Sequence, residues 1–184
     1  GLIEVAPVSS KYSFDFALSM CTASWRSSAG VLPCPGNQNS SAGSAIMLEE
    51  PRLENGRTED EPTIWMRPEQ VKDGWIMGIY PVYKVKTGDH FMAEIGCLAN
   101  STGCDVTFTL SYQIQGQPVK KLGSWWERYE GNFTRVDVDL AHLAGVPGRQ
   151  IPLEAIGLGP IVEASLAVTA IASAKPLRER GHQF

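Results

Sequence analysis

Hydrophobic and polar residues alternate with a period of two along much of this chain. The clearest example is residues 106–115, in which Val, Phe, Leu, Tyr and Ile alternate with Thr, Ser and Gln. Successive side chains of a β-strand point to opposite faces, so the pattern predicts a strand with one buried and one solvated face. In residues 135–140, Val136, Val138 and Leu140 alternate with charged residues in the same way.

Less regular alternation marks further strand candidates, which are separated by Gly, Pro and Asn turns. These candidates are residues 14–20, 74–85, 90–98, 119–129, 150–158 and 162–173. Pro81 interrupts one of them and predicts a bend or a sheet edge. Residues 26–44 and 51–63 are expected to be irregular, and residues 139–145 to include a short helix. The chain is therefore expected to form one domain over residues 1–184, an all-β, jelly-roll-like β-sandwich of about nine or ten strands.

Four cysteines, Cys21, Cys34, Cys97 and Cys104, predict two disulfides that staple this sandwich. Each neighbouring pair flanks a loop rich in Ser, Gly and Asn, which favours Cys21–Cys34 and Cys97–Cys104 over the two other connectivities. The alternatives are a metal or a redox site, but the chain lacks Cys-x-x-Cys spacing. Structural disulfides persist in oxidising compartments, so we expect an extracellular or cell-surface protein.

Composition and motifs argue against several function classes. The 16 basic and 20 acidic residues give no basic field of the kind that nucleic-acid binders use. No run of about 18 apolar residues is present, so no membrane span is expected. Nucleophile-elbow, zinc-protease, P-loop and dinucleotide motifs are missing, and the three histidines are scattered. We therefore expect no catalytic residues, and a hydrolase with an unrecognised constellation is the least favoured alternative.

Carboxylates crowd the turn-prone segment that follows residue 48. Glu49, Glu54 and Asp60 are weak candidates for a Ca²⁺ site, because Ca²⁺ prefers oxygen ligands in flexible loops. The segment lacks the Asp-x-Asp-x-Asp-Gly spacing of a dedicated calcium loop. A solvated acidic loop is the favoured interpretation, and no cofactor is predicted.

Tryptophans are numerous for a chain of this length, and a sugar ring can stack on an exposed one. Trp75, Trp125 and Trp126 are the candidates for such a glycan platform. Because adjacent residues on a strand face opposite ways, one of Trp125 and Trp126 is expected in the core. For each tryptophan taken alone, burial in the core is the favoured interpretation.

Several segments together resemble a β-sandwich module that recurs in large secreted and cell-surface bacterial proteins. They are "LPCPG" (32–36), "LENG" (53–56), "GWIMGIYPVYKVKTGDHFMAEIGCL" (74–98), "CDVTFTLSY" (104–112), "WWERYEG" (125–131) and "VDVDLAHLAG" (136–145). The resemblance implies a jelly roll related in shape to carbohydrate-binding modules, and it brings no catalytic residues with it. The end of this chain departs from the pattern, because it lacks an aromatic-containing final segment. Fold alone does not give function.

The ends of the chain and three sequons complete the candidate sites. Leu2, Ile3, Val5 and Val8 make residues 1–10 a candidate edge strand or a donor strand for a neighbouring subunit, whereas residues 175–184 form a polar tail. Asn39, Asn100 and Asn132 lie in sequons and are glycosylation candidates.

The favoured function is a non-catalytic structural or adhesive subunit. It would self-associate, or bind other surface proteins, in a cell-surface fibre or lattice. The alternative is a carbohydrate-binding module of a secreted protein, with a glycan as its partner.

Overall fold

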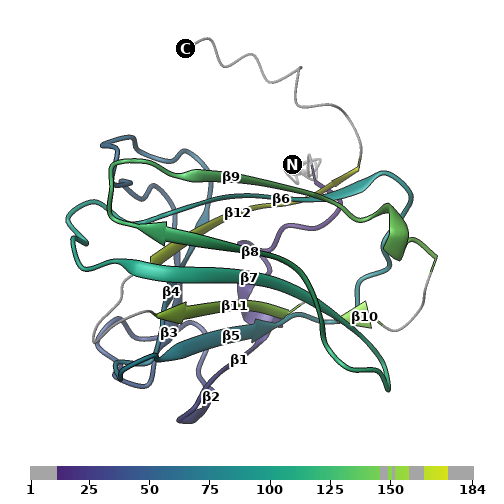
Figure 1. Cartoon of the computed structure of the whole chain (residues 1–184), viewed down its shortest axis with the longest axis horizontal. Coiled ribbons are helices and arrows are strands. Elements are labelled where there is room, and N and C mark those ends of the chain that lie inside the picture. Colours follow the sequence, from purple (N-terminus) through teal and green to yellow (C-terminus); the bar gives the residue numbers. More distant parts are fainter. Residues whose placement is uncertain (1–11, 146–148, 151, 158–163, 174–184) are drawn as a thin grey trace, which may run out of the picture.

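The fold is a β-sandwich of two antiparallel sheets (Figure 1). The structure is a computed structural model that describes residues 12–145, 149–150, 152–157 and 164–173, with side chains described over residues 12–145. Every strand pair in these residues is antiparallel. The all-β sandwich predicted from the alternation is therefore confirmed.

The first sheet has seven strands. They are β1 (Ser24–Ser27), β2 (Gly30–Leu32), β5 (Trp75–Ile79), β7 (Asp105–Ile114), β8 (Lys120–Arg128), β10 (Arg149–Gln150) and β11 (Pro152–Gly157). In space, β8 pairs with one side of β7, and β11 pairs with the other side. The sheet then continues through β5 and β1 to β2, which is its edge.

The second sheet has five strands in the order β3-β4-β12-β6-β9. They are β3 (Ser44–Leu48), β4 (Thr63–Arg67), β6 (Asp89–Gly96), β9 (Thr134–Asp139) and β12 (Ala164–Ser173). The described residues thus form twelve strands, more than the nine or ten expected, because short strands such as β2 and β10 carry too few residues to show a period.

One hydrophobic core lies between the sheets and contains alternate residues of the long strands β6 and β7. Val106, Phe108 and Leu110 of β7 belong to it, as do Phe91 and Ile95 of β6. Burying such side chains removes apolar surface from water at about 25 cal/mol per Å², which is the main favourable term in folding.

Two predictions for the first part of the chain are wrong. Residues 14–20 do not form a strand: residues 16–19 form turns, and a 3₁₀ turn follows at Met20–Thr22. The reason is local, because Asp15 Oδ1 accepts the Leu18 N–H at 2.9 Å and so closes a turn. The segment 26–44, expected to be irregular, contains β2 and the end of β1, which form a hairpin in which Gly30 adopts a φ of 115°.

The disulfides join Cys21 to Cys34 and Cys97 to Cys104, the sequence-local pairing. A second 3₁₀ turn, Ala141–Leu143, lies where the short helix is predicted.

Candidate functional site

The outer face of the seven-stranded sheet carries the candidate site. On β5, Ile76 points into the core, as does Tyr80 just after the strand, whereas Trp75 and Met77 lie on the opposite face and are half-buried. The side chains of β7 alternate in the same way: Val106 and Phe108 are buried, and Thr107 between them is half-exposed. A β-strand places alternate residues on opposite faces, so these outward positions form one surface.

The strand register aligns the outward residues into rows across the sheet. Trp126 of β8 lies opposite Thr107 of β7, which lies opposite Ile156 of β11, which lies opposite Trp75 of β5. Neighbouring strands are spaced by about 4.8 Å, so the two tryptophans stand about 14 Å apart in one row. We call this surface the tryptophan face; its described members are Trp75, Met77, Thr107, Thr109, Ser124 and Trp126.

The next row of the tryptophan face is polar at its centre. Ser124 lies opposite Thr109, and their hydroxyl oxygens are 3.1 Å apart. Along the same row, Met77 lies opposite Arg26 of β1, which is exposed. Hydroxyl and guanidinium groups beside two indole rings offer both hydrogen bonds and apolar stacking surfaces to a ligand.

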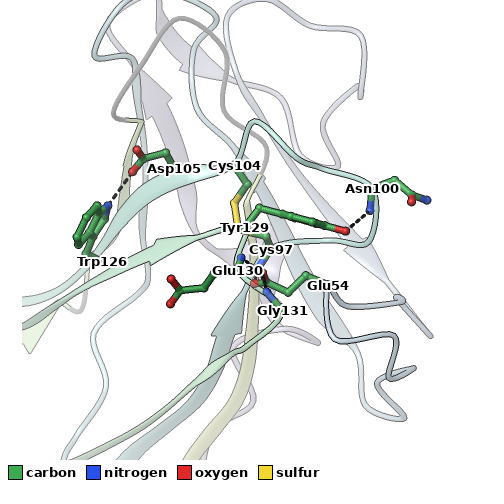
Figure 2. The surroundings of a disulfide bond; sticks show 9 residues. All are labelled: Glu54, Cys97, Asn100, Cys104, Asp105, Trp126, Tyr129, Glu130 and Gly131. Carbon is green, nitrogen blue, oxygen red and sulfur yellow. Dashed lines mark hydrogen bonds between the residues drawn. A yellow bond between two sulfur atoms is a disulfide. The ribbon is translucent and has the colours of Figure 1, made fainter.

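Trp126 is the most exposed aromatic side chain of this face, with 57% of its surface in solvent. Its orientation is fixed by two neighbours, one at the ring edge and one over the ring. The indole Nε1–H donates to Asp105 Oδ1 at 2.7 Å (Figure 2), and the Arg128 Cζ lies 4.5 Å from the ring centroid. Arg128 in turn pairs with Glu130 at 3.3 Å. The indole is thus held, and a guanidinium covers only one of its two faces.

Trp125 is not part of the tryptophan face, which corrects one of the three platform candidates. It neighbours Trp126 on β8, so it faces the other way, and its half-buried ring packs against the core. The absence of a side chain at Gly123 makes room for it, since a Cβ at that position would lie 2.4 Å from the Trp125 ring.

The two remaining tryptophans also lie elsewhere. Trp25 is 1% exposed in the core, where its Nε1–H donates to the Met20 carbonyl at 2.9 Å. Trp65 lies on the five-stranded sheet, with the Arg67 guanidinium 5.5 Å from its ring.

The Cys97–Cys104 disulfide lies next to the tryptophan face and joins the end of β6 to the start of β7 (Figure 2). The N–H of Tyr129 donates to the Cys104 carbonyl at 3.0 Å, which extends the β7–β8 pairing up to the disulfide. The Tyr129 hydroxyl accepts the Asn100 N–H at 3.3 Å. Asp105, the residue after Cys104, therefore starts β7 from a fixed position.

Glu54, one of the Ca²⁺ candidates, accepts three backbone N–H groups. One of its oxygens accepts the Cys97 N–H at 3.0 Å, and the other accepts the Glu130 and Gly131 N–H groups at 2.6 and 2.8 Å. Glu49 and Asp60 are exposed. Within residues 12–145, no group of three or more His, Cys, Asp or Glu side chains is arranged to hold a metal ion.

Two glutamates that the sequence did not single out have strongly raised pKa values. Burial, followed by the proximity of Glu94, raises the pKa of Glu59 to about 7. Burial, with smaller contributions from the charges of Glu54 and Glu130, raises the pKa of Glu127 to about 7 against the opposing effect of a hydrogen bond with Thr134. Both are placed by long-range pairing, so no local motif marks them.

The other candidate residues do not converge on one site. Asn39, Asn100 and Asn132 are exposed in loops. His90 forms a partly exposed pair with Asp137, with Nδ1 2.6 Å from Oδ1. The assembly candidates Leu2, Ile3, Val5 and Val8, residues 1–10 as a whole and the tail 175–184 lie outside the described residues. None of the helical turns in the described part of the chain has the length and apolar character of a membrane span.

Comparisons with known proteins show likeness in fold. No family model and no curated protein matches the sequence. A structure of carbohydrate-binding modules from the β-sandwich superfamily matches with a TM-score of 0.55 and 11% identity. The match covers 89% of this chain and 62% of that one, so this chain spans less than two thirds of its length.

Two further structures are more distant. The module TmCBM61, in complex with β-1,4-galactotriose, has a TM-score of 0.48 and 9% identity, covering 87% of this chain and 96% of that one. The C-terminal family 22 carbohydrate-binding module of Clostridium thermocellum Xyn10B has a TM-score of 0.46 and 11% identity, covering 92% of this chain and all of that one. The match with a TM-score of 0.55 shows that the fold of this chain is similar to that of β-sandwich carbohydrate-binding modules, as the sequence resemblance implies.

Proposed function

We propose that this domain is a non-catalytic carbohydrate-binding module of a secreted or cell-surface protein, and that its tryptophan face binds an oligosaccharide. The observation that carries the proposal is the shared register row of Trp75 and Trp126 on one solvated sheet face. Likeness in fold to β-sandwich carbohydrate-binding modules supports it. Two disulfides support a location in an oxidising compartment.

The spacing of the two tryptophan positions bears on the size of the ligand. Their backbones lie three strand spacings, about 14 Å, apart. A ligand that stacks on both rings is therefore an oligosaccharide chain rather than a single sugar unit, and it lies across the strands. Thr107 lies between the two ring positions, where its hydroxyl can accept or donate a hydrogen bond to a sugar hydroxyl.

The proposal favours the alternative function over a self-assembling subunit. The likeness in fold supports a carbohydrate-binding module, whereas the assembly hypothesis depends on residues 1–8, which lie outside the described residues, and stays a prediction. A hydrolase would need a pair of side chains positioned around a scissile bond, and the proposal assigns no such role to any residue.

Glycan-array binding followed by titration calorimetry tests the proposal with the variants Trp75→Ala and Trp126→Ala. Loss of one stacking contact of about 1.4 kcal/mol should weaken binding about tenfold in each variant. Trp65→Phe, on the other sheet, is the matched control and should bind like the wild type. Circular dichroism melts should show that all variants remain folded. Absence of binding to any glycan, or equal binding by wild type and both alanine variants, would refute the proposal.

A further inference from the structure

The Asp105 carboxylate has a specific place beside Trp126. In the β7–β8 register, Asp105 lies opposite Arg128, and Trp126 lies opposite Thr107, two residues away. The hydrogen bond from Nε1–H to Asp105 therefore runs diagonally between the strands and makes the indole lean toward the start of β7 (Figure 2). At 2.7 Å the bond lies at the short end of the usual N–H···O range.

We propose that Asp105 is the positioning residue of the tryptophan face and holds the Trp126 indole in the orientation that stacks on a sugar ring. The inference rests on the proposed function and deepens it. An exposed tryptophan without such a partner samples several rotamers, and a ligand must then bear the cost of immobilising one of them. A ring that is already fixed avoids this cost.

Asp105 is itself held by the covalent framework. It follows Cys104, which is buried and bonded to Cys97 at the end of β6 in the other sheet. The hydrogen bond from the Tyr129 N–H to the Cys104 carbonyl fixes the same point to the end of β8. The disulfide thus anchors the carboxylate, and the carboxylate orients the ring.

This arrangement also defines what Trp126 can recognise. Asp105 occupies the only hydrogen-bond donor of the indole, and Arg128 covers one ring face. The remaining ring face contacts a ligand through π-surface alone. The sugar unit at Trp126 must therefore present a flat, C–H-rich face, whereas its hydroxyl groups are recognised by neighbouring polar residues.

Three substitutions of Asp105 separate the positioning role from a purely structural one. Asp105→Asn keeps an acceptor oxygen at nearly the same place, whereas Asp105→Ala removes it and Asp105→Leu replaces it with a similar volume. Asp137→Ala, which removes a partly exposed carboxylate on the other sheet, is the control. The readouts are the ¹H–¹⁵N resonance of the Trp126 indole, its hydrogen exchange with water, and affinity for the glycan that binds best on the array.

We expect Asp105→Ala and Asp105→Leu to shift the Trp126 indole resonance, to speed its exchange and to weaken glycan binding about three- to tenfold. Asp105→Asn should restore both the resonance and most of the affinity. If Asp105→Ala destabilises the fold, the result for Asp105→Leu decides whether Asp105 positions the Trp126 indole. An unchanged indole resonance, or unchanged affinity in a wild type that binds glycan, would overturn the inference. If the wild type binds no glycan, the proposed function fails, and the indole resonance alone decides whether Asp105 orients the ring.

Discussion

Glu127 is a buried carboxyl group in a strand whose neighbouring residues are exposed. It is 4% exposed, and its pKa is raised to about 7, mainly because burial disfavours the charged form. In the unfolded chain the same group has a pKa near 4.5. Between these two values the folded protein binds more protons than the unfolded chain, so this group makes the fold less stable as the pH rises from about 4.5 to about 7.

Replacing Glu127 by Gln should therefore stabilise the domain at high pH. The amide keeps the shape and has no charge to bury, so its advantage over Glu should grow from pH 5 to pH 8, up to about 3 kcal/mol. Urea denaturation at several pH values measures this difference. Part of the pH dependence should remain in the variant, because Glu59 has a similarly raised pKa. A constant difference between variant and wild type at all pH values would contradict the assignment.

The sequence predicted the relative orientation of neighbouring side chains better than their exposure in the folded sheet. Alternation alone indicated that Trp125 and Trp126 face opposite ways, and this is what the structure shows. It could not indicate which ring is exposed, because that depends on pairing with β7. The row that joins Trp126 to Trp75 passes through β11, a strand that is remote in sequence from Trp75. No local pattern contains that information.

At the scale of elements, the acidic loop that contains Glu54 forms hydrogen bonds to the ends of two strands. Glu54 precedes its partner Cys97 by 43 residues and its partners Glu130 and Gly131 by 76 and 77 residues. The loop thereby joins the end of β6 to the turn between β8 and β9 (Figure 2). Hydrogen bonds to an ionised acceptor are about twice as strong as neutral ones. Glu130 of this turn pairs with Arg128, which lies over the Trp126 ring, so the turn is connected to the tryptophan face.

Glu54→Gln should loosen that junction. The amide group can accept at one oxygen only, and its NH₂ meets backbone donors, so we expect a loss of about 2 kcal/mol. The local signature is faster hydrogen exchange at the Glu130 and Gly131 amides. Glu49→Gln, in an exposed position of the same loop, is the matched control and should change neither quantity. Equal stability of the two variants would show that the three N–H contacts contribute nothing.

Strand prediction succeeded where the elements are long. The period-two segments at 106–115 and 135–140 correspond to β7 and β9, and residues 162–173 contain β12. Prediction failed for residues 14–20, where the Asp15 side chain closes a turn although the residue pattern alternates. A side-chain hydrogen bond of this kind competes with the sheet and leaves no mark on the hydrophobic period.

At the scale of the whole molecule, two short disulfide loops support a single core. Loop-closure entropy gives about 3 kcal/mol for Cys21–Cys34 and about 2.5 kcal/mol for Cys97–Cys104. Domains of this size have a free energy of unfolding of about 5–15 kcal/mol, so the two crosslinks supply a substantial part of it. The sandwich is thus suited to an oxidising compartment, in which both crosslinks persist.

For the whole molecule, the salt dependence of binding distinguishes stacking on a glycan from nonspecific electrostatic adsorption. The chain has a formal net charge of −4, and the proposed ligand contacts are indole faces and hydroxyl groups. Coulombic binding of a charged polymer to Arg26 and Arg128 would weaken steeply with salt, because the Debye length falls from about 20 Å to about 4 Å between 20 and 500 mM. Stacking and hydrogen bonding to a neutral sugar involve no such screening. We therefore expect the calorimetric affinity for a neutral oligosaccharide to change by less than about twofold over that salt range. A tenfold loss would contradict binding of the neutral sugar by stacking on Trp75 and Trp126 and by hydrogen bonding alone.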